Sequence, residues 1–151
     1  MSAQAGWRVR AAVAADAQAL LALRLALWPD ADDGLDDLQA ALAQSATSHL
    51  VVVDDADAAL GFAEVSVRHD YVNGTDSTPV GFLEGWYVVP AWRGRGLGRA
   101  LVAAAAEWTR EQGCAELASD AQLEDGNAQA AHASCGFEPT ERVVYFRLQL
   151  A

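Results

Sequence analysis

The pattern of apolar and polar positions along the chain predicts strands and helices in a mixed order. Valine-rich or alternating stretches predict strands over Trp7–Val13, His49–Asp54, Ala59–Asp70, Val80–Val89, Cys114–Ser119 and Val143–Leu150. Leucine or alanine at three- and four-residue spacing predicts helices over Asp16–Pro29, Leu35–Ala46, Leu97–Gln112 and Asn127–Ser134, and Asp16 is expected to cap the first of them. This order predicts an α/β (α+β) fold around a mixed sheet, without the strand-helix alternation of a dinucleotide-binding fold.

The size and composition of the chain predict one globular domain over residues 1–151. Hydrophobic residues make up 52% of the 151 residues and charged residues 21%. The start, Met1–Gly6, lacks a basic segment followed by an apolar one, and no apolar run approaches the ~20 residues that cross a bilayer. We therefore expect a soluble cytoplasmic protein with no membrane partner.

The cysteines, histidines and charges narrow the classes of ligand. Cys114 and Cys135 lack CxxC spacing and the three histidines are scattered, so no metal is expected. The formal net charge is -11, which argues against a nucleic-acid surface. An acidic protein suits a cationic partner, although the acidity could equally serve solubility alone.

The ten basic residues are all arginines, and three of them lie in the glycine-rich stretch "PAWRGRGLGRAL". A turn from a strand into a helix exposes unpaired backbone N–H groups at the positive end of the helix dipole. Glycines let anionic oxygens approach these groups, and arginines add bidentate donors. A bare helix start would explain the glycines but not the arginines, so this turn is the predicted diphosphate site.

Arg93-x-x-Gly96-x-Gly98, after an apolar strand and before a helix, resembles the acyl-CoA motif of the GCN5-related N-acetyltransferases (GNAT). A later "CGF" turn at Cys135–Phe137 adds to the likeness. The resemblance implies a mostly antiparallel sheet splayed between its fourth and fifth strands and flanked by helices, with acetyl-CoA as cosubstrate. The implied acetyl-CoA-binding residues are Trp86, Tyr87, Val88, Arg93, Gly94, Arg95, Gly96, Leu97, Gly98, Arg99, Asp125 and His132.

A narrower resemblance spans nearly the whole chain. The segments "LWP", "RHDYVNG", "FLEG", "ASD" and "TERV" are similar, in this order, to the short aminoglycoside 6'-N-acetyltransferases. The resemblance implies transfer of acetyl to the 6'-amine of an aminoglycoside, a polycationic antibiotic, with resistance as the outcome, and a homodimer.

Glu84 is the first candidate catalytic residue from the sequence itself. It interrupts the apolar run "VGFLEGWYVV", where a carboxylate needs a partner or a cleft. A carboxylate beside an ammonium can orient it and accept its proton, directly or through water. The N–H of Val88 is the candidate donor to the thioester oxygen, although Trp86, Tyr87 and Val88 could also be simply an apolar strand.

The resemblance adds four substrate-binding candidates to Glu84. Asp120, which is also a candidate catalytic residue, matches a substrate carboxylate and would hold the amine beside Glu84, although it could equally cap a helix or form a turn. Trp28 would form a flat wall, Tyr71 would lie on a long loop, and Glu141 would meet a further ammonium. The same residues could instead be core, a loop anchor and a solvated charge.

The acidic run "DADDGLDD", after Trp28, would steer a polycation, or form a solvated helix face. His132 stands where many relatives of the superfamily carry a tyrosine, and it could donate a proton, bind coenzyme A or pack. Asp125 stands where an asparagine is expected, with Asn127 as the alternative. Two other functions stay open: acetylation of another amine, such as a polyamine or a protein N-terminus, and acetyl-CoA binding without catalysis.

Overall fold

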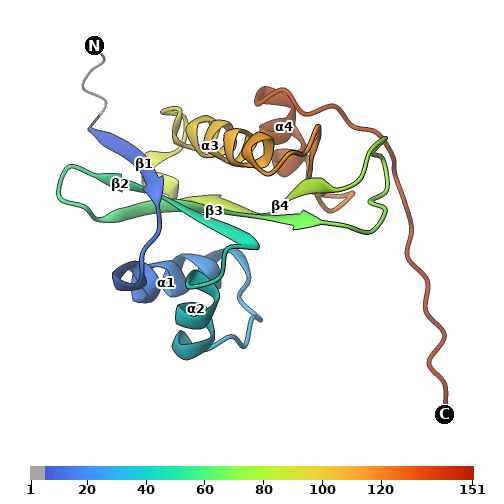
Figure 1. Cartoon of the computed structure of the whole chain (residues 1–151), viewed down its shortest axis with the longest axis horizontal. Helices are drawn as coiled ribbons and strands as arrows, with labels where there is room; N and C mark the ends of the chain where they lie inside the picture. Colours follow the sequence, from blue (N-terminus) through green and yellow to red (C-terminus); the bar gives the residue numbers. More distant parts are fainter. Residues whose placement is uncertain (1–5) are drawn as a thin grey trace.

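A five-stranded sheet in the order β1-β2-β3-β4-β5 runs through the molecule (Figure 1). The computed structural model describes residues 6–151. The expectation about the first residues, Met1–Gly6, therefore concerns a segment that lies almost entirely outside the described residues. The strands are β1 (Trp7–Ala11), β2 (Thr47–Asp54), β3 (Ala59–Arg68), β4 (Val80–Val88) and β5 (Leu117–Ala118). The first four are antiparallel neighbours, whereas β5 runs parallel to β4 and pairs with it through only two residues.

Helices cover both faces of this sheet (Figure 1). One face carries α1 (Ala17–Leu27) and α2 (Leu35–Leu42), and the other carries α3 (Leu97–Glu111) and α4 (Gly126–Ser134). Two single-turn 3₁₀ helices, η1 (Ala14–Asp16) and η2 (Pro90–Trp92), lead into α1 and toward α3.

The apolar run of β2 explains the two layers. Leu50 and Val52 pack in the core against α3, whereas Val51 and Val53 pack in the core against α1 and α2. The three valines are fully buried. A strand buried on both faces reads as a continuous apolar run, and each buried valine contributes about 1.5–3 kcal/mol of hydrophobic stabilisation.

The predicted helices and the first five predicted strands are confirmed, with shifted ends. Asp16 does not cap α1 with its side chain: it accepts hydrogen bonds from the Val13 N–H at 2.7 Å and from both terminal nitrogens of Arg10. These bonds, led by the one from Arg10, lower the pKa of the Asp16 carboxyl.

The strand predicted over Val143–Leu150 is wrong: residues 137–151 have no regular secondary structure. This C-terminal tail leaves the body of the molecule beside the end of the sheet (Figure 1). From Val143 onward its apolar side chains are exposed, with Tyr145 at 83%, Phe146 at 91% and Leu148 at 84% of their surface. The alternation of apolar and polar residues suits a strand, but no edge strand of the described residues pairs with this segment.

Over residues 6–151, none of the helices is both long and apolar enough to cross a membrane.

Candidate active site

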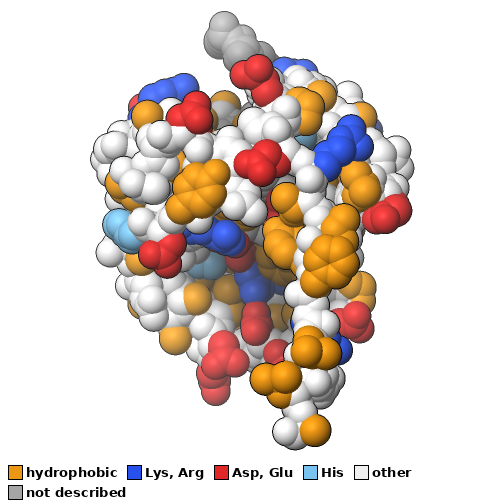
Figure 2. Space-filling model, turned by 90° about the vertical axis from the view of Figure 1, so that its right-hand side faces the viewer, with side chains coloured by type: hydrophobic (Ala, Val, Ile, Leu, Met, Phe, Trp, Pro, Cys, Tyr) orange, Lys and Arg blue, Asp and Glu red, His pale blue; other side chains and the backbone are white. Residues whose placement is uncertain are grey.

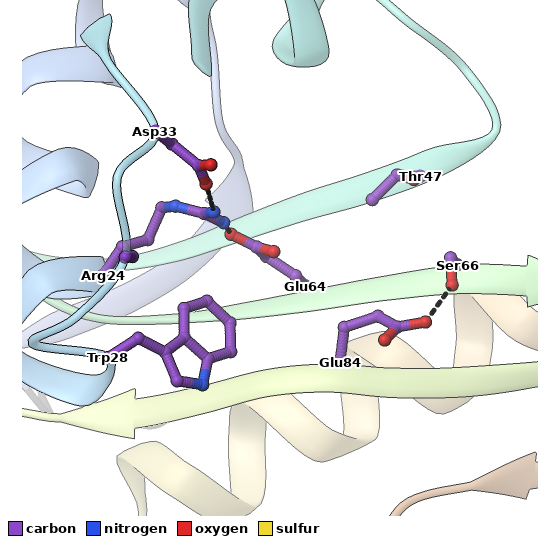
Figure 3. A pocket seen from close by; sticks show the side chains of 8 residues that line it. Arg24, Trp28, Asp33, Thr47, Glu64, Ser66 and Glu84 are labelled. Carbon is purple, nitrogen blue, oxygen red and sulfur yellow. Dashed lines mark hydrogen bonds and ion pairs between the residues drawn. The ribbon is translucent and has the colours of Figure 1, made fainter. Parts of the chain in front are cut away.

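A cleft of about 590 Å³ opens between α1 and the end of the sheet formed by β3 and β4. It is seen as a hollow, with basic and acidic side chains inside it, on the face shown in Figure 2. The side chains drawn in Figure 3 come from α1, the segment after α1, and strands β2, β3 and β4. The cleft is lined by Arg24, Trp28, Ala31, Asp33, Thr47, Glu64, Ser66 and Glu84.

Glu84 reaches this cleft because of a β-bulge. Glu64 of β3 pairs with Gly85, and Val65 pairs with Leu83, so Glu84 has no partner residue across the ladder. A bulge breaks the strict alternation of a strand and redirects a side chain. Glu84 and the open side of Gly85 consequently both face α1, in support of the expectation that this carboxylate faces a cleft.

Both carboxylate oxygens of Glu84 are hydrogen-bonded. Ser66 Oγ donates to Oε2 at 2.5 Å (Figure 3). Arg68 donates from Nε to Oε2 at 3.0 Å and from Nη2 to Oε1 at 2.7 Å. The side chain of Glu84 keeps 29% of its surface exposed. The carboxylate is therefore held in one orientation while it remains open to the cleft.

Trp28 forms a wall of the cleft, as predicted for it. It follows the last residue of α1 and meets Phe62 of β3 edge to face, with ring centroids 6.1 Å apart. A Cβ on Gly85 would lie 2.4 Å from Trp28 Cη2, so the indole occupies space that only a glycine leaves. The indole contacts β4 directly beside Glu84.

A buried ion cluster supports this wall, and the sequence analysis missed it. Arg24 of α1 pairs with Glu64 and, at 2.5 Å, with Asp33 (Figure 3). Its guanidinium also lies over the Trp28 ring, 5.1 Å from the centroid. The sequence does contain a signal for this cluster. Arg24 and Glu64 interrupt apolar segments, as Glu84 does, and the reasoning that identified Glu84 applies to them as well.

His49 lies beside this cluster and is buried. Its Nδ1 is 3.9 Å from Glu64 Oε1, a contact that would favour the charged imidazole. Burial and the nearby Arg24 outweigh that contact because Glu64 is already neutralised by Arg24, and they lower the pKa of His49 below its ordinary 6.5. The cluster therefore holds a neutral histidine.

The arginine-glycine turn lies where β4 runs through η2 into α3. Gly94 and Gly96 have φ of +79° and +91°, values that favour glycine, and both are exposed. The first backbone bond of α3 is donated by Ala100 to Gly96 O, so the N–H groups before Ala100 have no partner within the helix. The structure thus has an exposed glycine turn at a helix start, and anion binding by this turn stays a prediction.

Trp86 and Arg93 fix this turn to β4. Trp86 Nε1 donates to Gly98 O at 3.1 Å, and a Cβ on Gly98 would lie 3.2 Å from the indole. Arg93 Nε donates to Val88 O at 2.7 Å. Its guanidinium lies over the Tyr87 ring at 5.3 Å from the centroid.

Among the described residues Arg93 uses only its Nε for a hydrogen bond, so its terminal nitrogens remain available to a ligand, as do the other two arginines of the turn. Arg95 lies over Trp92 at 4.7 Å from the ring centroid, and both Arg95 and Arg99 are exposed. Leu97, in contrast, is buried in the core and can offer only its backbone.

His132 and Asp125 have partners within the protein. His132 hydrogen-bonds through Nδ1 to Ala128 O at 2.7 Å and through Nε2 to Ser119 Oγ at 2.9 Å. Its ring packs edge to face against Trp86 and Phe137. Asp125 caps α4, accepting from the Ala128 N–H at 2.9 Å. Packing of His132 and helix capping by Asp125 are thus observed, and their contacts with coenzyme A stay predictions.

Tyr71, Asp120 and Glu141 do not line the cleft with Glu84 and Trp28. Asp120 follows β5, Tyr71 lies on the loop after β3, Glu141 lies on the tail, and all three are exposed. A Cβ on Gly74 would meet Thr140 Oγ1 and lie 3.8 Å from Glu141 Oε2, so the tail begins against the loop that carries Tyr71. Their roles toward a substrate stay predictions.

Glu116 anchors that same loop. Its carboxylate accepts hydrogen bonds from Ser77 Oγ and, at 2.9 Å, from the Asp76 N–H. These bonds, chiefly the one from Ser77, lower the pKa of Glu116.

The structure describes no group of three or more His, Cys, Asp or Glu side chains that could hold a metal in residues 6–151.

The sequence of this chain is similar to those of known acetyltransferases. The sequence model of the acetyltransferase (GNAT) family matches residues 16–137. The chain is 58% identical over 142 residues to an aminoglycoside N(6')-acetyltransferase type 1 of Stenotrophomonas maltophilia, covering 94% of this chain and 93% of that protein. A protein of the same name from Salmonella typhimurium is 46% identical over 131 residues, covering 83% of this chain and 87% of that protein.

Solved structures agree over nearly the full length. The aminoglycoside antibiotic 6'-N-acetyltransferase AAC(6')-Ih from Acinetobacter baumannii has a TM-score of 0.90 at 37% identity, covering 97% of this chain and 100% of that chain. AAC(6')-Iy, in complex with the bisubstrate analog CoA-S-monomethyl-acetylneamine, has a TM-score of 0.88 at 39% identity, covering 95% of this chain and 99% of that chain.

Proposed function

Because the chain belongs to the acetyltransferase (GNAT) family, we propose that it transfers the acetyl group of acetyl-CoA to the 6'-amine of an aminoglycoside. One observation carries the proposal: β4 presents Glu84 in an open cleft and leads directly into an exposed arginine-glycine turn. The names of its relatives, and the complex of one of them with an acetylneamine–CoA analog, support this substrate pair.

The turn fits the diphosphate of acetyl-CoA. Residues 94–99 supply backbone N–H groups, and Arg93, Arg95 and Arg99 supply guanidinium donors for its oxygens. Trp86, Tyr87 and Val88 lie on the strand leading to the turn and would pair with the pantetheine arm much as a neighbouring strand would. β5 leaves room for such an arm because it pairs with β4 only at Gly81 and Phe82.

Glu84 acts on the amine. A primary amine reaches the cleft as an ammonium, which the carboxylate binds and then deprotonates, directly or through one water. The freed amine attacks the thioester carbon, and the Val88 N–H stabilises the oxygen that becomes negative. The C–S bond then breaks, and the surplus proton on the new amide nitrogen passes to the departing coenzyme A thiolate, directly or through water. The reaction needs no covalent enzyme intermediate. Asp120 would hold the amine beside Glu84, with Trp28, Tyr71 and Glu141 contacting the rest of the aminoglycoside.

We also propose a homodimer in which the C-terminal tail of each chain adds to the sheet of its partner. Val143–Leu150 has the alternation of a strand, but Val144, Tyr145 and Phe146 are exposed. A segment that exposes large apolar side chains and leaves its backbone unpaired suits pairing with a second copy. Glu141, at the start of this tail, lies close to the Tyr71 loop.

The remaining proposals concern the setting of the enzyme. The two sides of one sheet hold the two core clusters, which supports a single domain over the chain. Both cysteines are free thiols, in keeping with a reducing cytoplasm. There, acetylation of an incoming aminoglycoside would confer resistance.

Steady-state kinetics with purified protein test the proposed function. We expect acetyl-CoA-dependent acetylation of kanamycin-type amines with a higher kcat/KM than for a polyamine or a peptide N-terminus. Glu84→Gln should lower kcat more than acetyl-CoA affinity, and Arg93→Ala should do the reverse. A preference for polyamines or peptides would favour another amine as substrate, and binding of acetyl-CoA without turnover would mark a non-catalytic domain.

A further inference from the structure

The carboxylates that line the cleft are all paired with arginines of the same chain. Asp33 and Glu64 both bind Arg24, and Glu84 binds Arg68. The cleft is therefore close to neutral: three carboxylates face two guanidinium groups. An amine that needs a carboxylate must compete with a cation that is already present.

The two arginines are held very differently. Arg24 has a side chain only 13% exposed, held by two carboxylates and the Trp28 ring. Arg68 is the last residue of β3, and its side chain is 43% exposed. Among residues 6–151, its guanidinium has ion-pair or ring partners only in Glu84 and in the Phe82 ring, 3.6 Å from the centroid. Arg24 is a fixed part of the wall, whereas Arg68 can turn into solvent by giving up one ion pair and one ring contact.

We propose that Arg68 is an internal competitor of the substrate: its guanidinium occupies the ammonium position at Glu84 and must be displaced by the substrate amine. This inference rests on the proposed function. Both the resident and the incoming cation form charge-assisted hydrogen bonds to the same oxygens, so the exchange by itself gains little. A substrate with one ammonium therefore binds weakly.

A polycation recovers the difference at other carboxylates. Asp30, Asp32, Asp36 and Asp37 are exposed on the segment that follows Trp28 and continues into α2. Further ammonium groups of a polycation meet this acidic segment, and a monoamine has none to offer. Arg68 thus lowers the affinity for every amine by the same factor, and the additional charges of a polycation compensate for that loss.

The test compares two amines in the wild type and in Arg68→Gln: kanamycin as polycation, and 6-amino-6-deoxyglucose as a sugar with one amine. Removal of the resident cation should raise kcat/KM for both amines, by up to about fivefold, the scale of one partly exposed ion pair. Most of the change should appear in KM. Arg68→Lys, which keeps the charge, should leave both kcat/KM values within about twofold of the wild type.

Arg8→Gln is the matched control, because it also removes one arginine from an ion pair, the exposed pair with Asp57 outside the cleft. It should leave both kcat/KM values unchanged. Arg68→Met keeps the aliphatic stem against Phe82 and replaces the glutamine variant if that variant does not fold.

Four outcomes would overturn the inference. They are an equal loss of kcat for both amines in Arg68→Gln, kcat/KM values that do not rise in that variant, the same rise in Arg8→Gln, or the same rise in Arg68→Lys. The equal loss of kcat would make Arg68 a positioning residue for Glu84. A wild type that acetylates neither amine would instead refute the proposed function itself.

Discussion

Substitution of Gly85 by alanine tests whether the Trp28 wall binds the amine. The added Cβ would lie 2.4 Å from Trp28 Cη2, 2.8 Å from Cζ2 and 3.3 Å from Phe62 Cε2, whereas ordinary contact begins at 3.4 Å. The indole edge must therefore move by about 1 Å, and overpacking of this kind costs about 1–3 kcal/mol of folding free energy. The displaced ring also loses its alignment with a sugar ring in the cleft.

The kinetic consequence should be confined to the amine. An aromatic contact contributes about 0.5–1.5 kcal/mol, so KM for kanamycin should rise about three- to tenfold in Gly85→Ala. KM for acetyl-CoA should stay the same because the arginine-glycine turn lies beyond the end of β4 and does not contact Trp28. Initial rates with one substrate varied at saturation of the other measure both constants.

Gly81→Ala is the matched control on the same strand. Its Cβ would lie 2.5 Å from Thr109 Cγ2 of α3, on the opposite face of the sheet. Urea denaturation should show a comparable loss of stability, with KM for kanamycin unchanged. Equal rises of KM in the two variants, or a rise for acetyl-CoA alone in Gly85→Ala, would refute the assignment of Trp28 as the substrate wall.

Three further predictions follow from other parts of the structure. A chain ending at Arg142 should be monomeric by light scattering while the full chain is dimeric; a monomeric full chain would contradict the swapped tail. The unfolding free energy should fall as the pH drops from about 7.5 to 5.5, because the pKa of His49 is lower in the folded state and the unfolded state takes up the proton first. This dependence of the unfolding free energy on pH should be mostly lost in His49→Gln, and an identical dependence in the variant would exclude His49 as its source. Gly96→Ala, at φ +91°, should cost about 1–2 kcal/mol and weaken coenzyme A binding in calorimetry, whereas Gly126→Ala, with no atom within 4 Å and no positive φ, should do neither.

The sequence predicted the elements of the fold well because their signals are local. The valines of β2, and the glycine and proline residues between segments, mark strands and turns without reference to the rest of the chain. The prediction of the last strand was wrong because its formation depends on more than local sequence. Alternation over Val143–Leu150 shows that the segment suits a sheet, but a strand also needs a partner edge, which depends on the tertiary or quaternary arrangement.

The candidate site could likewise be predicted from the sequence only in part. A carboxylate inside an apolar run identified Glu84, because an isolated charge in a strand needs a reason to be there. The bulge that turns Glu84 toward Trp28 depends on the register between β3 and β4, which no single segment specifies. The pairing of Arg68 with Glu84 follows from that register and was therefore not predictable from the sequence.

A crystal structure of the protein with coenzyme A and kanamycin tests the central claim most directly. Our account predicts the diphosphate against the backbone N–H groups of residues 94–99, and the 6'-amine within hydrogen-bond distance of the Glu84 carboxylate with Arg68 turned away. A diphosphate bound elsewhere, or a 6'-amine remote from Glu84, would contradict it.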